Sequence, residues 1–250
     1  MKKILAVLLV AVLAIAAVAC TPKQPAENTN KPDTEKGEGV LKYSEFIAAA
    51  DQAENIAIEA YIQGKVYSSQ YQNVCLFLAD ADGGYYVYRM PCTDADDAKL
   101  VIGQKVKITG SKAIWKGLHE FKEGTATYEI LEGNYIADVA DITNETDLSK
   151  FMSMKVAVKG AEIVAKTVDG TDYAFLYQWN GSGDEGDDIY FDVKIGEATY
   201  TFVVETDLAD KDSAAYKAIQ GIKIGDKVDL EGFLYWYDGA QLQVTSVTVK

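Results

Sequence analysis

An internal repeat is the feature that most constrains the fold of this chain. The segment Ile102–Gly110 aligns without a gap with Ile224–Gly232, and both segments alternate apolar and polar residues after a Gly turn. Continuing the alignment places Trp115-Lys116-Gly117 opposite Tyr237-Asp238-Gly239, so an aromatic residue leads into a turn in each copy. The chain from residue 40 onward is therefore predicted to contain one β-rich unit twice.

The first copy is predicted to carry a short helix between its third and fourth strands. Thr93 and Asp96 have capping-box spacing, with Asp in place of the usual Glu, and mark the start of a helical turn towards Leu100. The remaining expected elements are a helix over Tyr43–Gln52 and strands over Ala57–Tyr67, Val74–Ala79, Tyr85–Arg89, Gln104–Lys112 and Thr125–Leu131. Three strands, a helix and two strands follow one another in the five-stranded OB-fold barrel.

The second copy repeats this order with an addition. Its expected elements are a helix near Leu148–Ser153, strands that begin at Lys155, Tyr173, Ile189 and Thr199, a helix over Ser213–Gln220, and strands over Lys227–Trp236 and Gln241–Val249. An extra hairpin or extension is expected around Asp184–Val193. The predicted fold class is all-β with short helices, as two tandem OB-fold-like five-stranded barrels over residues 40–141 and 142–250.

The N-terminal segment predicts a location outside the cytoplasm. Residues 1–19 have two lysines, a short apolar run and an Ala-Val-Ala end, which is typical of a bacterial signal peptide, and Cys20 follows directly. Cys20 is the predicted lipidation site, which would anchor the chain to the membrane at the bacterial cell surface; ordinary secretion is the alternative. Residues 20–39 are rich in Pro and polar residues and predict a flexible tether with a reach of about 25 Å.

Three segments resemble a known group of proteins. Tyr85–Cys92, Lys105–Gly110 and Leu230–Tyr237 are similar to uncharacterised bacterial cell-surface lipoproteins with tandem OB-fold-like domains. The resemblance covers nearly the whole chain after the signal peptide. It implies a fold and a location, and no established activity.

Charge and cysteine content limit the classes of partner. The formal net charge of −14 opposes a nucleic-acid backbone, so nucleic acid is predicted to be an unlikely partner, and membrane contact is expected through acyl chains on Cys20 alone. Cys75 and Cys92 are too few for a disulfide framework. They either pair across a hairpin or stay as separate buried thiols.

No pattern of catalytic or metal-binding residues is evident, and no cofactor motif is present. His119 is the only histidine, and its neighbour Glu120 points to the opposite face of the expected strand, so the two are poorly placed to act together. Asp80–Gly84 lacks the later ligands of a Ca²⁺ loop and predicts a hairpin turn with Gly at positive φ. Asp184–Asp188 is either a solvated acidic loop or a weak cation site. The chain is predicted not to be an enzyme.

Tyrosine is unusually frequent, with 16 copies, and predicts an aromatic binding surface. OB folds bind ligands across strands two and three, between the loops that follow strands one and four. The candidate ligand-binding residues on that surface are Tyr67, Tyr71, Tyr86, Tyr88, Trp115 and His119 in the first copy and Tyr177, Trp179, Tyr190, Trp236 and Tyr237 in the second. About half of these are expected in the barrel cores.

These features predict an extracytoplasmic binding module for carbohydrate or a protein partner. The alternatives are a structural or assembly lipoprotein of the cell envelope without a small ligand, and an OB protein that binds oligonucleotides. A ligand groove should leave aromatic side chains exposed on a concave face, whereas a scaffold should expose a flat apolar patch.

Overall fold

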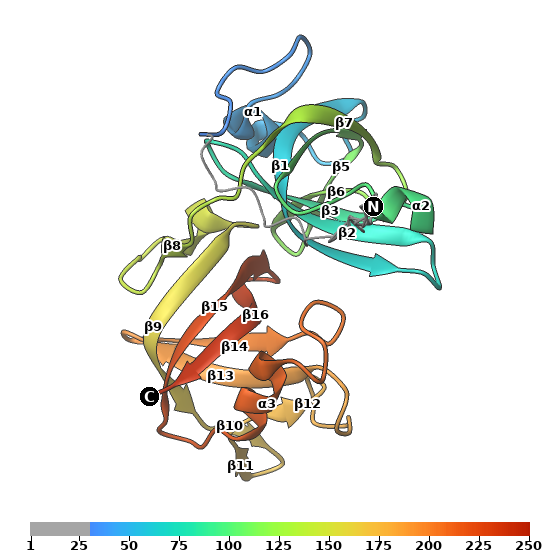
Figure 1. The fold of residues 1–250 in the computed structure, drawn as a ribbon. Helices are drawn as coiled ribbons and strands as arrows, with labels where there is room; N and C mark the ends of the chain where they lie inside the picture. Colours follow the sequence, from blue (N-terminus) through green and yellow to red (C-terminus); the bar gives the residue numbers. More distant parts are fainter. Residues whose placement is uncertain (1–30) are drawn as a thin grey trace, which may run out of the picture.

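The computed structural model describes residues 31–250, which form two β-barrels joined end to end (Figure 1). The predicted signal peptide, Cys20 and the first half of the predicted tether lie outside the described residues. Within residues 31–250, no helix is long and apolar enough to cross a membrane.

The first barrel follows the predicted order. Its elements are α1 (Tyr43–Ala48), β1 (Ile56–Ser68), β2 (Asn73–Ala79), β3 (Gly84–Pro91), α2 (Asp94–Asp97), β4 (Gln104–Gly110), β5 (Lys112–Trp115), β6 (Leu118–Phe121) and β7 (Thr127–Asn134). The sheet order is β5-β6-β3-β2-β1-β4-β7, and the parallel pairing of β3 with β6 closes the barrel. Segment β5 continues β4, and segment β7 continues β6. Segments β4 and β5 therefore form the fourth barrel strand, and β6 and β7 form the fifth, which pairs with it. The predicted OB-fold class is confirmed.

The predicted capping residues begin α2. The Thr93 hydroxyl accepts a hydrogen bond from the backbone N–H of Asp96 and donates one to its carboxylate. The first of these contacts supplies one of the hydrogen bonds that the backbone of a first helical turn lacks. The helix ends at Asp97, before Leu100, and α1 likewise ends at Ala48, before the predicted Gln52.

The second barrel has the same five strands and a longer first connection. Its elements are β8 (Ala140–Asp141), η1 (Leu148–Phe151), β9 (Lys155–Val164), β10 (Lys166–Val168), β11 (Thr171–Tyr173), β12 (Leu176–Tyr177), β13 (Ile189–Ile195), β14 (Ala198–Val204), α3 (Ala214–Gln220), β15 (Lys227–Trp236) and β16 (Ala240–Val249). Strand β9 pairs with β13 and β15, and β14 pairs in parallel with β16. The helix α3 again separates the third strand from the fourth.

The position of the addition differs from the prediction. The extra hairpin spans β10 and β11, and the whole connection between strands one and two runs over residues 165–188. The strand Ile189–Ile195 belongs to the barrel, not to an extension, because Ile189, Phe191 and Val193 are buried in its core. Tyr173 ends the small hairpin and begins no barrel strand.

Each barrel has its own apolar core. The first core packs Phe46 between Tyr85 and Phe121, with ring centroids 5.2 and 5.3 Å away. The second core contains Phe191 and Phe202 in an edge-to-face pair. Two separate cores fit the duplicated unit predicted from the repeat.

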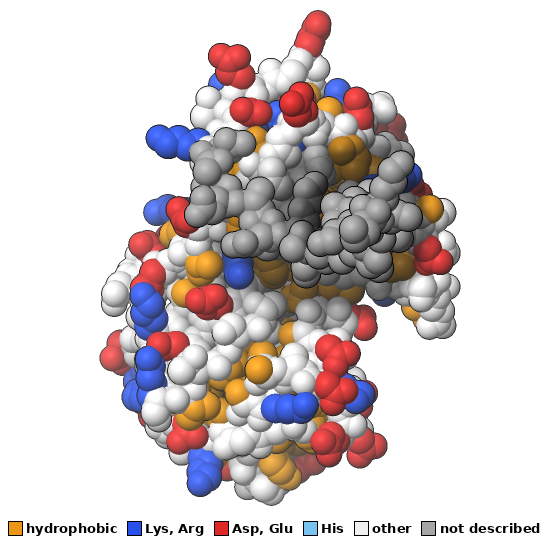
Figure 2. All heavy atoms as spheres, in the orientation of Figure 1, with side chains coloured by type: hydrophobic (Ala, Val, Ile, Leu, Met, Phe, Trp, Pro, Cys, Tyr) orange, Lys and Arg blue, Asp and Glu red, His pale blue; other side chains and the backbone are white. Residues whose placement is uncertain are grey.

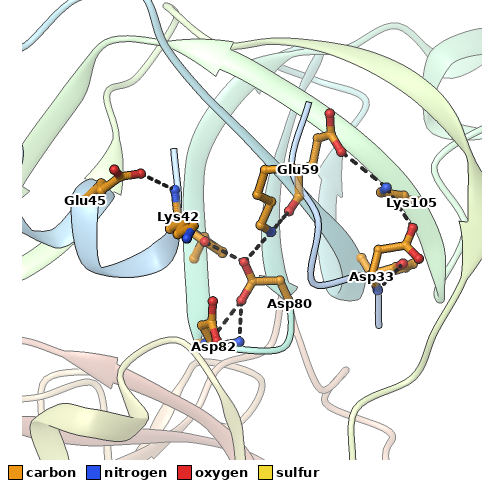
Figure 3. A network of polar contacts seen from close by, with 11 residues as sticks. Asp33, Lys42, Glu45, Glu59, Asp80, Asp82 and Lys105 are labelled. Atoms are coloured by element: carbon orange, nitrogen blue, oxygen red, sulfur yellow. Dashed lines mark hydrogen bonds and ion pairs between the residues drawn. The ribbon is translucent and has the colours of Figure 1, made fainter. Parts of the chain in front are cut away.

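Asp80 organises the turn between β2 and β3 (Figure 3). One carboxylate oxygen accepts hydrogen bonds from the backbone N–H groups of Asp82 and Gly83, at 2.8 and 2.9 Å. The other accepts from the Lys36 ammonium at 2.6 Å and the Tyr85 hydroxyl at 2.7 Å. Four donors compensate this buried carboxylate fully.

The prediction of positive φ in this turn is wrong, because neither Gly83 nor Gly84 lies in the left-handed region. Glycine is needed here for close packing. A Cβ on Gly83 would lie 2.6 Å from the Tyr43 ring, and one on Gly84 would lie 2.7 Å from the backbone nitrogen of Met154 in the second barrel.

Cys75 and Cys92 are free thiols and do not pair. Cys75 lies within β2, whereas Cys92 follows the end of β3 and bonds through its backbone to Gln72, so the two are not cross-strand partners. Burial raises the pKa of both thiols, that of Cys92 to about 11.

Candidate ligand-binding surface

The two hairpin turns identified by the repeat meet at the junction of the barrels. Lys116 and Gly117 have φ of 51° and 87°, and Asp238 and Gly239 have φ of 54° and 158°. The Asp238 backbone N–H donates to the Lys116 carbonyl at 2.8 Å, and the Lys116 ammonium lies 2.6 Å from the Asp238 carboxylate. Equivalent turns of the two copies therefore contact each other through a hydrogen bond and an ion pair.

An apolar contact continues this junction between the barrels. The interdomain cluster consists of Phe77, Tyr86, Leu118, Met152 and Phe233, which are all buried. Phe77 and Phe233 stack with ring centroids 4.3 Å apart. Through these contacts the second barrel packs against strands β2 and β3 of the first.

The junction covers the surface on which the first copy was expected to bind a ligand. Tyr86 is only 6% exposed, and burial raises its pKa well above the usual range. Its ring meets Tyr235 of the second barrel edge to face at 5.6 Å. Tyr88 and Trp236 are half-buried beside the same cluster. In the first barrel, strands two and three are thus used for packing between domains.

The corresponding surface of the second barrel is open. A hollow of about 530 Å³, here called the aromatic hollow, lies over its second and third strands and is lined by Lys166, Trp179, Tyr190, Thr201, Tyr237 and Gln241. Tyr190 comes from β13, Thr201 from β14 and Tyr237 from the turn after β15. Trp179 comes from the long connection after the first strand. Trp179 is 69% exposed and Tyr237 is 50% exposed, so both present ring surface to solvent.

The charges of the aromatic hollow are locally compensated. The Lys166 ammonium lies 2.9 Å from the Asp192 carboxylate, which also accepts a hydrogen bond from Thr201 at 2.7 Å. Burial, together with the charges of Asp188 and Glu205, raises the pKa of Tyr190 to about 12. Its phenol is therefore a neutral hydrogen-bond donor at ordinary pH. The hollow combines flat apolar rings with polar groups at their edges.

A second hollow lies at the junction of the two barrels. This junction hollow has a volume of about 470 Å³ and is lined by Gln52, Tyr88, Ala113, Ile114, Trp115, Glu120, Lys122, Glu123 and Tyr235. Trp115 is 56% exposed and stands beside the paired hairpin turns. Tyr88 and Trp115 were predicted from the sequence to line a binding surface. Glu120 and Tyr235 were not predicted there, because only the contact between the barrels encloses them.

The remaining candidate residues lie apart from both hollows. The Tyr67 hydroxyl donates to the Asp94 carboxylate, and Tyr71 is exposed on the loop after β1. Tyr177 accepts a hydrogen bond from Gln220 of α3. His119 is half-buried on β6, where burial lowers its pKa.

The acidic loop Asp184–Asp188 is held by hydrogen bonds to the chain. Asp187 accepts from the Asp184 N–H through its side chain and from the Tyr216 hydroxyl through its carbonyl. Asp188 accepts from the backbone and hydroxyl of Thr206. Over residues 31–250, no group of three or more His, Cys, Asp or Glu residues is arranged to hold a metal ion.

No protein-family model and no curated protein sequence matches the chain. Among solved structures, the p204 HINb domain is similar at 12% identity and a TM-score of 0.34, over 80% of this chain and 100% of that one. The Ifi202 HINa domain in complex with 20bp dsDNA is similar at 14% identity and a TM-score of 0.34, over 79% and 96%. A Replication Protein A heterotrimer bound to ssDNA is similar at 10% identity and a TM-score of 0.35, over 84% and 52%.

These matches correct one expectation. Nucleic acid was predicted to be an unlikely partner, whereas two of these three similar structures hold DNA. Net charge sums over the whole chain and does not describe one surface. Figure 2 shows lysine and arginine side chains interspersed with acidic ones over the visible face of the molecule. The strand order of the chain itself assigns both halves to the OB fold.

Proposed function

We propose that the chain is a non-catalytic binding module that holds a ring-bearing polymer in the aromatic hollow of the second barrel. The observation that carries this proposal is the position of the hollow. It lies over strands two and three and between the loops after strands one and four, where OB folds bind oligonucleotides and oligosaccharides. Exposed aromatic side chains in a concave site favour a ligand groove over a flat assembly surface.

A single-stranded oligonucleotide is the first candidate ligand. Trp179 and Tyr237 offer ring faces on which bases stack, and such stacking contributes ~1–3 kcal/mol per base. Lys166 lines the hollow, and in the proposed complex its ammonium would exchange its contact with Asp192 for a phosphate of the strand.

A carbohydrate is the second candidate, and the compensation of Lys166 by Asp192 favours it. A hollow without net positive charge suits a neutral polymer. The C–H faces of sugar rings pack on aromatic rings, and the polar groups of Tyr190 and Gln241 line the hollow, where sugar hydroxyls would reach them.

Titration of the purified protein with a dT12 oligonucleotide and with a panel of neutral oligosaccharides tests this proposal. Trp179→Ala should weaken binding of the true ligand by about tenfold, because it removes a stacking face. Tyr71→Ala is the matched control, since Tyr71 is equally exposed but lies outside the hollow. Salt-dependent binding identifies the oligonucleotide and salt-independent binding the sugar. Saturable binding of neither probe, or equal binding by Trp179→Ala, would contradict the proposal.

We also propose that the module is lipid-anchored through Cys20 at the bacterial cell surface. The support is the signal-peptide pattern of residues 1–19, the thiol that follows it, and the polar tether that leads to the first barrel. Metabolic labelling with a radioactive fatty acid should mark the wild-type protein and not the Cys20→Ser variant. Equal labelling of the two proteins, or none of either, would refute the anchor.

A further inference from the structure

The junction hollow has an aromatic wall that is contributed by both barrels. Tyr88 and Trp115 belong to β3 and β5 of the first barrel, and Tyr235 belongs to β15 of the second. The hollow is separate from the aromatic hollow, and its ligand does not depend on which polymer the second barrel binds.

Glu120 is an unpartnered carboxylate in this hollow. It is 5% exposed, and it lies on the same face of β6 as Leu118, which belongs to the interdomain cluster. Among residues 31–250, no group donates a hydrogen bond to its carboxylate or forms an ion pair with it. Asp80 is similarly buried but has four donors. The Glu120 oxygens are not among the fully buried, unpartnered polar atoms of residues 31–250, so they face the hollow that Glu120 lines. A carboxylate on a largely buried side chain is poorly hydrated, and a ligand that supplies a donor in the hollow would compensate it.

Lys122 is the cationic residue among those that line the hollow, and it does not pair with Glu120. The Lys122 ammonium donates to the Gln52 side chain at 2.8 Å. The Glu123 carboxylate pairs with Arg89 at 3.3 Å, and its charge also acts on Glu120. Burial and the charge of Glu123 raise the pKa of Glu120 to about 7. Burial also raises the pKa values of the Tyr88 and Tyr235 phenols, so both are neutral at ordinary pH.

We propose that the junction hollow binds an organic ammonium group, with the Glu120 carboxylate as its counter-ion and the rings of Tyr88, Trp115 and Tyr235 packed against its alkyl part. Ammonium groups bind to carboxylates through charge-assisted hydrogen bonds and to aromatic faces through cation–π contacts. A metal ion fits less well, because hard cations need several oxygen ligands and no such cluster exists within residues 31–250.

Calorimetric titration of the purified protein with n-butylammonium chloride tests this site. The probe should bind saturably, whereas n-butanol, which has the same alkyl chain without the charge, should not. Glu120→Gln should weaken binding by about tenfold or more. Glu129→Gln is the matched control, because Glu129 is an exposed carboxylate on β7 of the same barrel. Trp115→Ala truncates an exposed side chain, leaves the carboxylate in place, and should also weaken binding.

The pH dependence provides an independent readout. Binding requires ionised Glu120, and the alkylammonium stays protonated between pH 6 and 8, so the affinity should rise by about tenfold over this interval. The Glu120→Gln variant should show no such rise. Parallel titrations with glucosamine and with an acetyl-lysine amide that keeps its free side-chain ammonium separate an amino sugar from a lysine side chain as the source of the group. Absence of saturable binding, an equal affinity of n-butanol, or unchanged binding by Glu120→Gln would overturn the proposal.

Discussion

At the scale of single residues, the buried charged groups differ in how fully their neighbours satisfy them. Lys112 is completely buried, and its ammonium donates to the carbonyls of Phe46, Ile47 and Ala49 at 2.7, 2.8 and 2.6 Å. These carbonyls lie at the C-terminal end of α1, where helical hydrogen bonds are missing. One side chain of the fourth strand therefore fixes the end of the first helix.

Lys112→Met should lower the free energy of unfolding by about 3 kcal/mol, because it leaves buried carbonyls without donors while keeping most of the apolar volume. Urea denaturation measures this loss. Lys99→Met is the control, since Lys99 forms an exposed ion pair with Asp96, and its effect should stay below about 1 kcal/mol. Equal effects of the two substitutions would show that the three carbonyls are satisfied in another way.

Glu205 makes stability depend on pH. Burial and the charges of Asp188 and Asp207 raise its pKa to about 7, above the usual value for glutamate. The folded state therefore binds this proton more tightly than the unfolded state, so the contribution of Glu205 is fully present at low pH and is lost as the pH rises towards 7. Glu205→Gln should match the wild type near pH 4 and exceed its stability at pH 8 by about 2 kcal/mol. Urea denaturation at both pH values, with Glu129→Gln as the neutral control, measures this difference; a constant difference would contradict it.

At the scale of elements, the two hairpin turns combine a local requirement with a contact between barrels. Gly117 has a φ of 87°, and a Cβ there would lie 2.9 Å from Trp236 of the second barrel. Gly124 has a φ of 73° and open space around its Cβ position. The two glycines share the backbone strain but not the contact.

Gly124→Ala should therefore cost about 1 kcal/mol of stability, and Gly117→Ala about 2 kcal/mol or more. Urea denaturation of both variants gives the comparison, and the tryptophan emission spectrum should shift only in Gly117→Ala, because Trp236 must move. Equal losses of stability in the two variants, without a spectral shift, would mean that the contact between the barrels accommodates the added methyl group without a free-energy cost.

The strands and turns were predictable because their signals are local. Alternating apolar residues and the turn pairs Lys116-Gly117 and Asp238-Gly239 fix strand ends with little help from the rest of the chain. The roles of Gly83 and Gly84 were not predictable, because both depend on atoms that are distant in sequence. The same applies to the binding surface. Tyr86 was identified as an aromatic strand residue, but only the second barrel decides that it is buried.

At the scale of the whole molecule, duplication gives two equivalent surfaces with different uses. The aromatic rings over β2 and β3 of the first barrel pack against the second barrel, whereas those over β13 and β14 face solvent around the aromatic hollow. The junction hollow exists only because the barrels are packed together. The two hollows should therefore respond differently when the barrels separate.

Phe233→Asp should separate the barrels while leaving each core intact. Phe233 stacks on Phe77 and would lie 2.5 Å from a Cβ on Gly64, so its ring fills the centre of the contact, and a buried aspartate there is strongly unfavourable. The radius of gyration from small-angle X-ray scattering should increase, and the far-ultraviolet circular dichroism should stay that of two β-barrels. Phe233→Leu keeps an apolar contact and should retain the compact form.

The same variant separates the two proposed binding sites. Phe233→Asp should abolish binding of n-butylammonium, because Tyr235 no longer lies beside Tyr88 and Glu120 in one hollow. The aromatic hollow draws all its lining residues from the second barrel, so binding of its polymer ligand should change by less than about threefold. Loss of both activities would mean that the second barrel needs the first to fold. Retention of n-butylammonium binding in separated barrels would place its site outside the junction.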